Sequence, residues 1–331
     1  MKFLSVLPRR LLLSAMGAAA VLGAAPVAWA QNAKAWPSQP IKLVVGFPAG
    51  TSPDLMARTL AEPLAEVLGQ PVVVDNRPGA GGNIGAAQVA RATDGHTFGL
   101  MVNGNMTIAK ILNPATPYDP ITDLAPVSLI AVAPLVLTAP NSAPVGGSAF
   151  WSAAKASGDR WNYGSPGIGT VAHLGMELIK AKAGISPVHV PYAGNPAVIT
   201  GMLGEQVHMA LLPPGLAMVQ VQAGKLRAVG VTSAGRSAVV PGVPSLSESG
   251  LPGVELEIWN AVAAPRQMPQ AHIVRLASAL TEIVRRPGVR AQIVAQGWQV
   301  VGTAPQGLAN RIAQDTATMS DVIQRNGIQA R

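Results

Sequence analysis

Short apolar runs alternate along the chain with segments in which apolar residues recur every three or four positions. Residues 41–47, 72–74 and 97–102 are apolar runs typical of buried strands. Residues 52–68 and 84–92 between them have helical spacing, so 41–102 is predicted to form one βαβαβ unit.

The rest of the chain repeats this alternation, and two Pro-, Gly- and Ser-rich stretches, 139–147 and 241–253, are read as linkers. Further strands are expected at 129–137, 161–163, 188–190, 207–212, 226–232 and 255–264, and helices after 170 and at 196–203, 215–223, 269–286 and 305–325. The chain therefore predicts an α/β protein with two similar halves, each built on a mostly parallel sheet covered by helices.

The helix at 52–68 carries its own start and stop signals. Ser52 is expected to be the N-cap, Pro53 the first helical residue and Asp54 the acid of the first turn, while Gly69 ends the helix. Pro63 is expected to kink it.

The first thirty residues read as an export signal. Lys2, Arg9 and Arg10 precede an uncharged run that ends in Ala28-Trp29-Ala30, which predicts cleavage before Gln31 and a periplasmic location. Loss of this segment lowers the formal charge of the 331-residue chain from +8 to +5, and the remaining Lys and Arg are scattered. Nucleic acid is therefore set aside as a partner.

The sequence lacks the residue patterns of most catalytic sites. The chain has no Cys, and its five His are never three or four residues apart, so no metal site and no cofactor is expected. A G-x-S-x-G nucleophile motif and a phosphate-binding G-K-[ST] motif are absent. Gly79–Gly85 follows a strand and opens a helix, but its spacing departs from the dinucleotide pattern and indicates a tight turn.

Three predicted strand-to-helix turns, 47–54, 103–105 and 164–173, are rich in Gly, Ser, Thr and Asn. In open α/β sheets, such turns gather at the carboxyl ends of the strands, where ligands bind. Glycine lets backbone N–H groups approach a ligand, and helix N-termini add unpaired donors. This pattern suits a carboxylate, although a single turn of this kind more often only caps its helix.

The chain resembles the periplasmic solute receptors of tripartite tricarboxylate transporters, the Bug receptors, along almost its whole exported length. The matching segments are 36–45, 47–54, 68–85, 118–120, 124–128, 162–165, 189–192, 223–228 and 243–253. Of these, Leu68–Gly85 is the most specific.

The resemblance implies a Venus-flytrap, type II-like periplasmic-binding-protein architecture: two doubly wound lobes around mixed, mostly parallel sheets. Residues 31–130 plus 256–331 would form lobe 1, and 131–255 lobe 2, with the crossings near 128–140 and 250–256 as the hinge. The resemblance implies that the protein is a monomeric receptor and not an enzyme. This receptor would pass a small organic acid (a di- or tricarboxylate, an amino acid or an aromatic carboxylate) to an inner-membrane permease.

Carried over by motif, the ligand-binding residues fall into three groups. The first wall comprises Phe47, Ala49, Gly50, Thr51 and Asp54; the second wall Ser165, Gly167, Gly169, Thr170 and His173; and further positions Asn103, Asn105, Tyr192 and Asn195.

The chain departs from the family pattern where Thr51 replaces a second glycine, which leaves the identity of the acid open. Two other functions are weighed: a sensor that presents its ligand to a membrane kinase, and a periplasmic hydrolase that uses Ser165 or Asp54 with His173.

Overall fold

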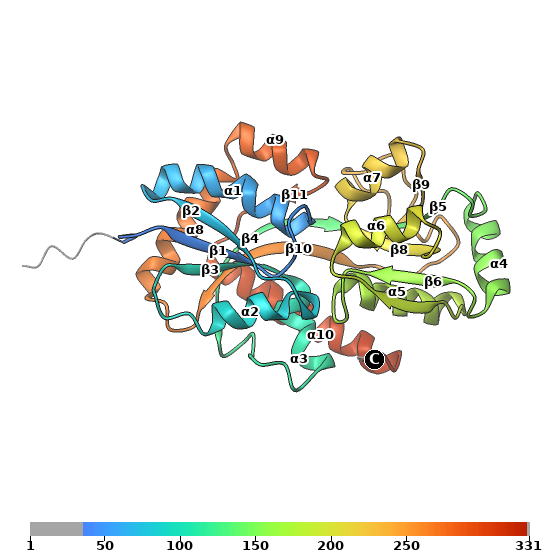
Figure 1. Ribbon diagram of the computed structural model, residues 1–331, viewed down its shortest axis with the longest axis horizontal. Helices are drawn as coiled ribbons and strands as arrows, with labels where there is room; N and C mark the ends of the chain where they lie inside the picture. Colours follow the sequence, from blue (N-terminus) through green and yellow to red (C-terminus); the bar gives the residue numbers. More distant parts are fainter. Residues whose placement is uncertain (1–35, 330–331) are drawn as a thin grey trace, which may run out of the picture. The chain divides into compact units, whose positions relative to one another are not determined.

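The computed structural model describes residues 36–329, which are built on two β-sheets with helices on both faces (Figure 1). The first sheet has the order β11-β4-β10-β3-β1-β2. Its strands are β1 (Ile41–Val45), β2 (Val72–Asn76), β3 (Thr97–Val102), β4 (Leu124–Pro134), β10 (Glu257–Pro265) and β11 (Gln299–Val300). The predicted signal segment 1–30 and its cleavage site lie outside the described residues.

The second sheet has the order β7-β6-β8-β5-β9. Its strands are β5 (Val136–Pro140), β6 (Asn162–Ser165), β7 (Val188–Pro191), β8 (Met209–Leu212) and β9 (Leu226–Val231). The chain thus enters the second sheet between Pro134 and Val136 and returns to the first between Val231 and Glu257.

Both sheets are mixed, as expected, but parallel pairing does not dominate. Among the described residues, β1 pairs in parallel with β2 and β3, and β6 with β7 and β8. The strands next to the crossings, β4, β5, β9 and β10, form antiparallel pairs. The single strand expected at 129–137 is wrong, because Leu135 separates β4 from β5 and the two strands belong to different sheets.

The helices sort onto the faces of the two sheets. In the first half, α1 (Ser52–Leu68), α8 (Gln270–Ile283) and α9 (Pro287–Ala295) share one core. The opposite face holds the short turns η1 (Ala80–Gly82) and η2 (Gly104–Ile108) with α2 (Asn83–Ala90) and the start of α10 (Pro305–Arg325). Helix α3 (Ala109–Leu112) packs through Ile111 and Leu112 against a core of the second half. In the second half, α4 (Gly147–Ser157) and α5 (Val171–Ala183) share a core, and α6 (Asn195–Leu203) and α7 (Pro214–Gln222) share another.

Helix α10 packs against both halves. Leu308 and Ile312 belong to a core of the first half, whereas Met319 and Ile323 belong to a core of the second. These contacts help to join the described residues, 36–329, into one compact unit. Among the described residues, no helix is long and apolar enough to span a membrane.

Helix α1 ends as predicted and begins one residue earlier than predicted. Thr51, with extended backbone, is the N-cap, which corrects the assignment of Ser52, and Pro53 is the second helical residue. Gly69 ends the helix with φ 72°, a left-handed conformation that glycine adopts without strain. This start places the first turn of α1 beside the loop that follows β1.

Candidate functional site

A cavity of about 60 Å³ lies where the chain leaves the parallel strands of both sheets. Its wall includes residues that follow β1, β3, β6 and β8 at their carboxyl ends: Thr51, Asn103, Thr170 and Pro213. The middle of β10 supplies the adjacent part of the wall through Trp259 and Asn260. The cavity therefore lies between the two halves of the protein.

Four helices begin at this cavity. Thr51 and Thr170 are the N-caps of α1 and α5, Asn195 is the first residue of α6, and Pro213 is the N-cap of α7. The first N–H groups of a helix have no acceptor within the helix, and its N-terminus carries roughly half a positive charge. Pro213 and Pro214 have no N–H, so α7 adds only its positive end, whereas α1, α5 and α6 can add N–H donors as well. Together these four ends create a positive potential that favours an anion.

The cavity wall carries no Asp, Glu, His, Lys or Arg side chain. Phe47, Trp259 and Trp298 make it strongly aromatic. The potential that attracts an anion therefore comes from the backbone, and the rest of the wall is neutral. Among the described residues, no group of three or more His, Asp and Glu is placed to hold a metal ion.

Polar atoms without partners are concentrated in this wall. Seven buried side-chain nitrogen and oxygen atoms of the described residues have no hydrogen-bond partner within the protein. Four of them belong to three residues of the cavity: Asn195 Oδ1, both amide atoms of Asn260, and Trp298 Nε1. Asn260 is 0 % exposed and Trp298 2 %, so each orphan atom costs free energy unless a ligand or water satisfies it.

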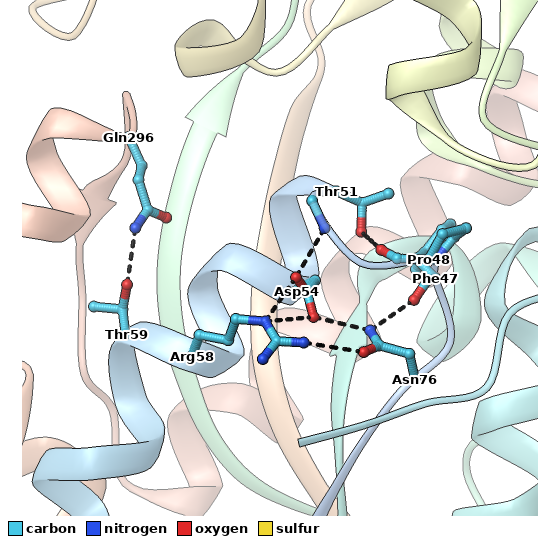
Figure 2. Close-up of polar contacts among 9 residues, drawn as sticks. Phe47, Pro48, Thr51, Asp54, Arg58, Thr59, Asn76 and Gln296 are labelled. Atoms are coloured by element: carbon cyan, nitrogen blue, oxygen red, sulfur yellow. Dashed lines mark hydrogen bonds and ion pairs between the residues drawn. The ribbon is translucent and has the colours of Figure 1, made fainter. Parts of the chain in front are cut away.

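Asp54 organises the loop after β1 instead of forming the cavity wall (Figure 2). Its carboxylate accepts hydrogen bonds from the Gly50 N–H at 2.9 Å, from Arg58 Nε at 3.0 Å and from Asn76 Nδ2 at 2.9 Å. Burial opposes ionisation of Asp54, but the hydrogen bonds from Arg58, Gly50 and Asn76 outweigh it, so its pKa is lowered. The charged Asp54 carboxylate therefore stabilises the loop that carries Ala49 and Gly50.

The loop after β6 is held by its own side chains. Thr170 Oγ1 donates to the Gly167 carbonyl at 2.8 Å and accepts from the His173 N–H, so Thr170 both caps α5 and closes the loop. His173 Nδ1 accepts from the Gly169 N–H at 3.4 Å. Burial lowers the pKa of His173, which keeps this nitrogen an acceptor.

Ser165 is fully buried, and its hydroxyl contacts His189 Nε2 at 2.7 Å. The His189 ring stacks on His173 at 4.5 Å, and burial, followed by the charge of His173, lowers the pKa of His189 to about 4. Ser165 is thus paired with His189 and not with His173, and its side chain is buried. This geometry offers no basis for a hydrolase built on Ser165 and His173.

The predicted residues divide between this cavity and a neighbouring pocket. Phe47, Thr51, Asn103, Thr170 and Asn195 line the cavity. Gly167, Gly169 and Tyr192, together with Phe47, line an adjacent pocket of about 660 Å³. Asn105 points elsewhere, because its amide donates to the Gly81 carbonyl at 3.1 Å and to Asn83.

Trp259, Asn260 and Trp298 are not among the predicted site residues. One signal was present, because Asn260 is a single amide within the apolar run Ile258–Ala264. A buried amide in a strand requires hydrogen-bond partners, and here the partners are missing within the protein.

The fold is that of a periplasmic solute-binding protein, and comparison with known proteins identifies the family. Residues 56–328 match the model of the tripartite tricarboxylate transporter family receptor. Protein BugT of Bordetella pertussis is 33 % identical over 311 residues, covering 93 % of this chain and 94 % of BugT. The chain therefore belongs to the TctC/Bug family of receptors, which are binding proteins and not enzymes.

Two solved structures have the same fold. The periplasmic binding protein BugD shares 30 % identity with a TM-score of 0.85, covering 89 % of this chain and 100 % of BugD. The Rpa4515 protein of R. palustris, solved with adipate, shares 30 % identity with a TM-score of 0.86, covering 89 % of this chain and 99 % of the other.

Proposed function

We propose that this chain captures a small organic carboxylate in the cavity between its halves and delivers it to the membrane permease of a tripartite tricarboxylate transporter. The observation that carries the proposal is the convergence of four helix N-termini on one cavity without charged side chains. The adipate bound to the related Rpa4515 protein supports the choice of a carboxylate.

The energetics favour reversible capture. Each backbone N–H that donates to a carboxylate oxygen is worth roughly 1.5–3 kcal/mol. Four such bonds exceed the costs of association and can leave about 8 kcal/mol, which corresponds to micromolar affinity. The hydrogen bonds to the Asp54 carboxylate and the Thr170 cap hold these donors in place before the ligand binds, so little conformational entropy is lost on binding.

The two halves act as lobes that close on the ligand. Lobe 1 comprises the first sheet with its helices, and lobe 2 the second sheet with its helices. The boundary expected at residue 130 is moved, because β4 continues in the first sheet to Pro134, so the crossings beside Leu135 and between Val231 and Glu257 form the hinge. Contacts at the far side of the cavity support a closed form: a Cβ on Gly215 of α7 would lie 2.3 Å from the Gln296 carbonyl oxygen. Closure of this kind requires glycine at that point.

Titration calorimetry of the exported chain, residues 31–331, tests the capture step. Butyrate, succinate, adipate, benzoate and citrate are titrated against butyramide and benzamide, which share shape without the negative charge. We expect at least one carboxylate to bind with a Kd below about 100 μM and its amide to bind about tenfold more weakly or not at all. Equal binding of acids and amides would contradict the role of the helix N-termini.

Delivery is tested separately in membrane vesicles that contain the permease. Uptake of the radiolabelled acid should require the receptor. Receptor added in excess without bound acid should not support uptake. If uptake is unchanged without the receptor, the protein is not the delivering subunit.

A further inference from the structure

The polar side chains in the cavity wall fall into two groups, those already paired and those left open. Trp259 Nε1 donates to Asp315 Oδ2 at 2.7 Å, and Asn103 Nδ2 donates to the Glu257 carbonyl at 2.8 Å. By contrast, the Trp298 N–H and the Asn260 amide have no partner within the protein. The sheet brings this open group together, because Asn260 and Val300, two residues after Trp298, are both paired with Ala131 of β4.

The open group has a definite hydrogen-bonding signature. Trp298 Nε1 can only donate, and Asn260 offers both a donor and an acceptor. A ligand group that satisfies them must therefore accept from Trp298 and also donate to an amide oxygen. A hydroxyl or a carboxamide does both.

Charged groups fit this end of the cavity poorly. A second carboxylate has acceptors only, so it would leave the oxygen of Asn260 unpaired. An ammonium group has donors only, and the wall contains no carboxylate to neutralise it, because Asp54 is committed to Gly50, Arg58 and Asn76.

We propose that the ligand is a small monocarboxylate that carries a hydroxyl or carboxamide group at its uncharged end. The carboxylate lies at the helix N-termini, and the neutral polar group is bound by Asn260 and Trp298. The cavity of about 60 Å³ is small, which favours short acids. This inference rests on the proposed function and separates this chain from a receptor for a dicarboxylate such as adipate.

Matched ligands test the proposal by calorimetry. 3-Hydroxybutyrate is compared with butyrate, which lacks the hydroxyl, and with succinate, which has a second carboxylate; lactate is compared with alanine, which has an ammonium group. We expect 3-hydroxybutyrate and lactate to bind about tenfold or more tightly than each of their matched partners. Tighter binding of succinate or alanine would overturn the inference but leave the carboxylate receptor intact, whereas no binding by any acid would overturn both.

Two variants test the residues. Trp298→Phe removes only the indole N–H and some volume, and Asn260→Leu removes both amide groups at similar size. In each, the preference for 3-hydroxybutyrate over butyrate should fall to within about threefold. Trp151→Phe is the control, since its N–H donates to the Ser249 carbonyl in lobe 2.

The result that would overturn the assignment is an undiminished hydroxyl preference in either folded variant. Melting curves identify a variant that fails to fold, and in that case the wild-type comparison of 3-hydroxybutyrate, butyrate and succinate decides the proposal by itself.

Discussion

Replacing Val171 with proline would remove one donor from the cavity while leaving helix α5 in place. Val171 is the first residue of α5, and proline is well tolerated at that position because its missing N–H has no acceptor within the helix. Thr170 before it already has an extended backbone, with φ −79° and ψ 157°, as the residue before proline requires. Val171→Pro therefore deletes a backbone N–H without changing any charge.

The expected loss of affinity comes from the strength of one hydrogen bond to a charged group. Such a bond is worth about 1.5–3 kcal/mol, which corresponds to roughly 10- to 150-fold in Kd. Val171 is buried, and proline packs less well than valine at this position, so we expect the unfolding free energy to fall by about 1 kcal/mol.

Calorimetry with the tightest carboxylate and urea denaturation measure the two effects on the same sample. Gln270→Pro is the matched control, because Gln270 is the exposed first residue of α8, away from the cavity. Its affinity should match that of the wild type. If Val171→Pro is folded and binds within about twofold of the wild type, the α5 N-terminus does not hold the carboxylate, and the reasoning from helix ends is refuted.

Three further changes have defined outcomes. Asp54→Ala should lower the unfolding free energy by about 2 kcal/mol and weaken carboxylate binding about tenfold at pH 7. Because the pKa of Asp54 is lowered in the fold, this stability difference should shrink as the pH falls through the folded-state pKa, as urea titrations at several pH values would show. The pKa of His189 is lowered to about 4 in the fold, so the unfolded chain takes up a proton first as the pH falls. The unfolding free energy should therefore fall by up to about 3 kcal/mol between about pH 6.5 and pH 4 and then level off, and His189→Gln should flatten this slope. Gly215→Ala should weaken binding about tenfold with little change in melting temperature, because its Cβ would meet the Gln296 carbonyl oxygen on closure, whereas Gly288→Ala, which has open space, should bind normally.

Elements with strong local signals could be predicted from the sequence to within a residue or two. The helix Pro305–Arg325 and the strand Thr97–Val102 have the predicted bounds. A proline marks the start of the helix, and an apolar run between polar turns defines the strand. Helix α4 is absent from the predicted elements, and the linker predicted at 139–147 overlaps only its first residue. Its Ala- and Ser-rich sequence buries mainly Phe150 and Ala154 and gives only a weak apolar stripe.

The features of the fold that local sequence patterns did not predict are set by tertiary contacts. A strand buried on both faces has no alternation, so the passage of the chain from one sheet to the other at Leu135 leaves no trace in the run from Leu129 to Leu137. The turns at the cavity were predictable because glycine, serine and threonine mark them locally. Asn260 was not, because antiparallel pairing with Val102 and Ala131, which are distant in the sequence, brings it to the cavity.

The origin of the donors links binding to closure. Helix α1 packs on the first sheet, whereas α5, α6 and α7 pack on the second, so the donors around the cavity come from both halves. On the proposed hinge motion, opening would withdraw one set of donors from the carboxylate and expose the ligand to water at the same time. An Arg side chain on one lobe could follow the ligand as the lobes part, but backbone N–H groups cannot, because each is fixed to its helix. Affinity would therefore fall steeply on opening, which is what a receptor needs if it is to release its ligand at the permease.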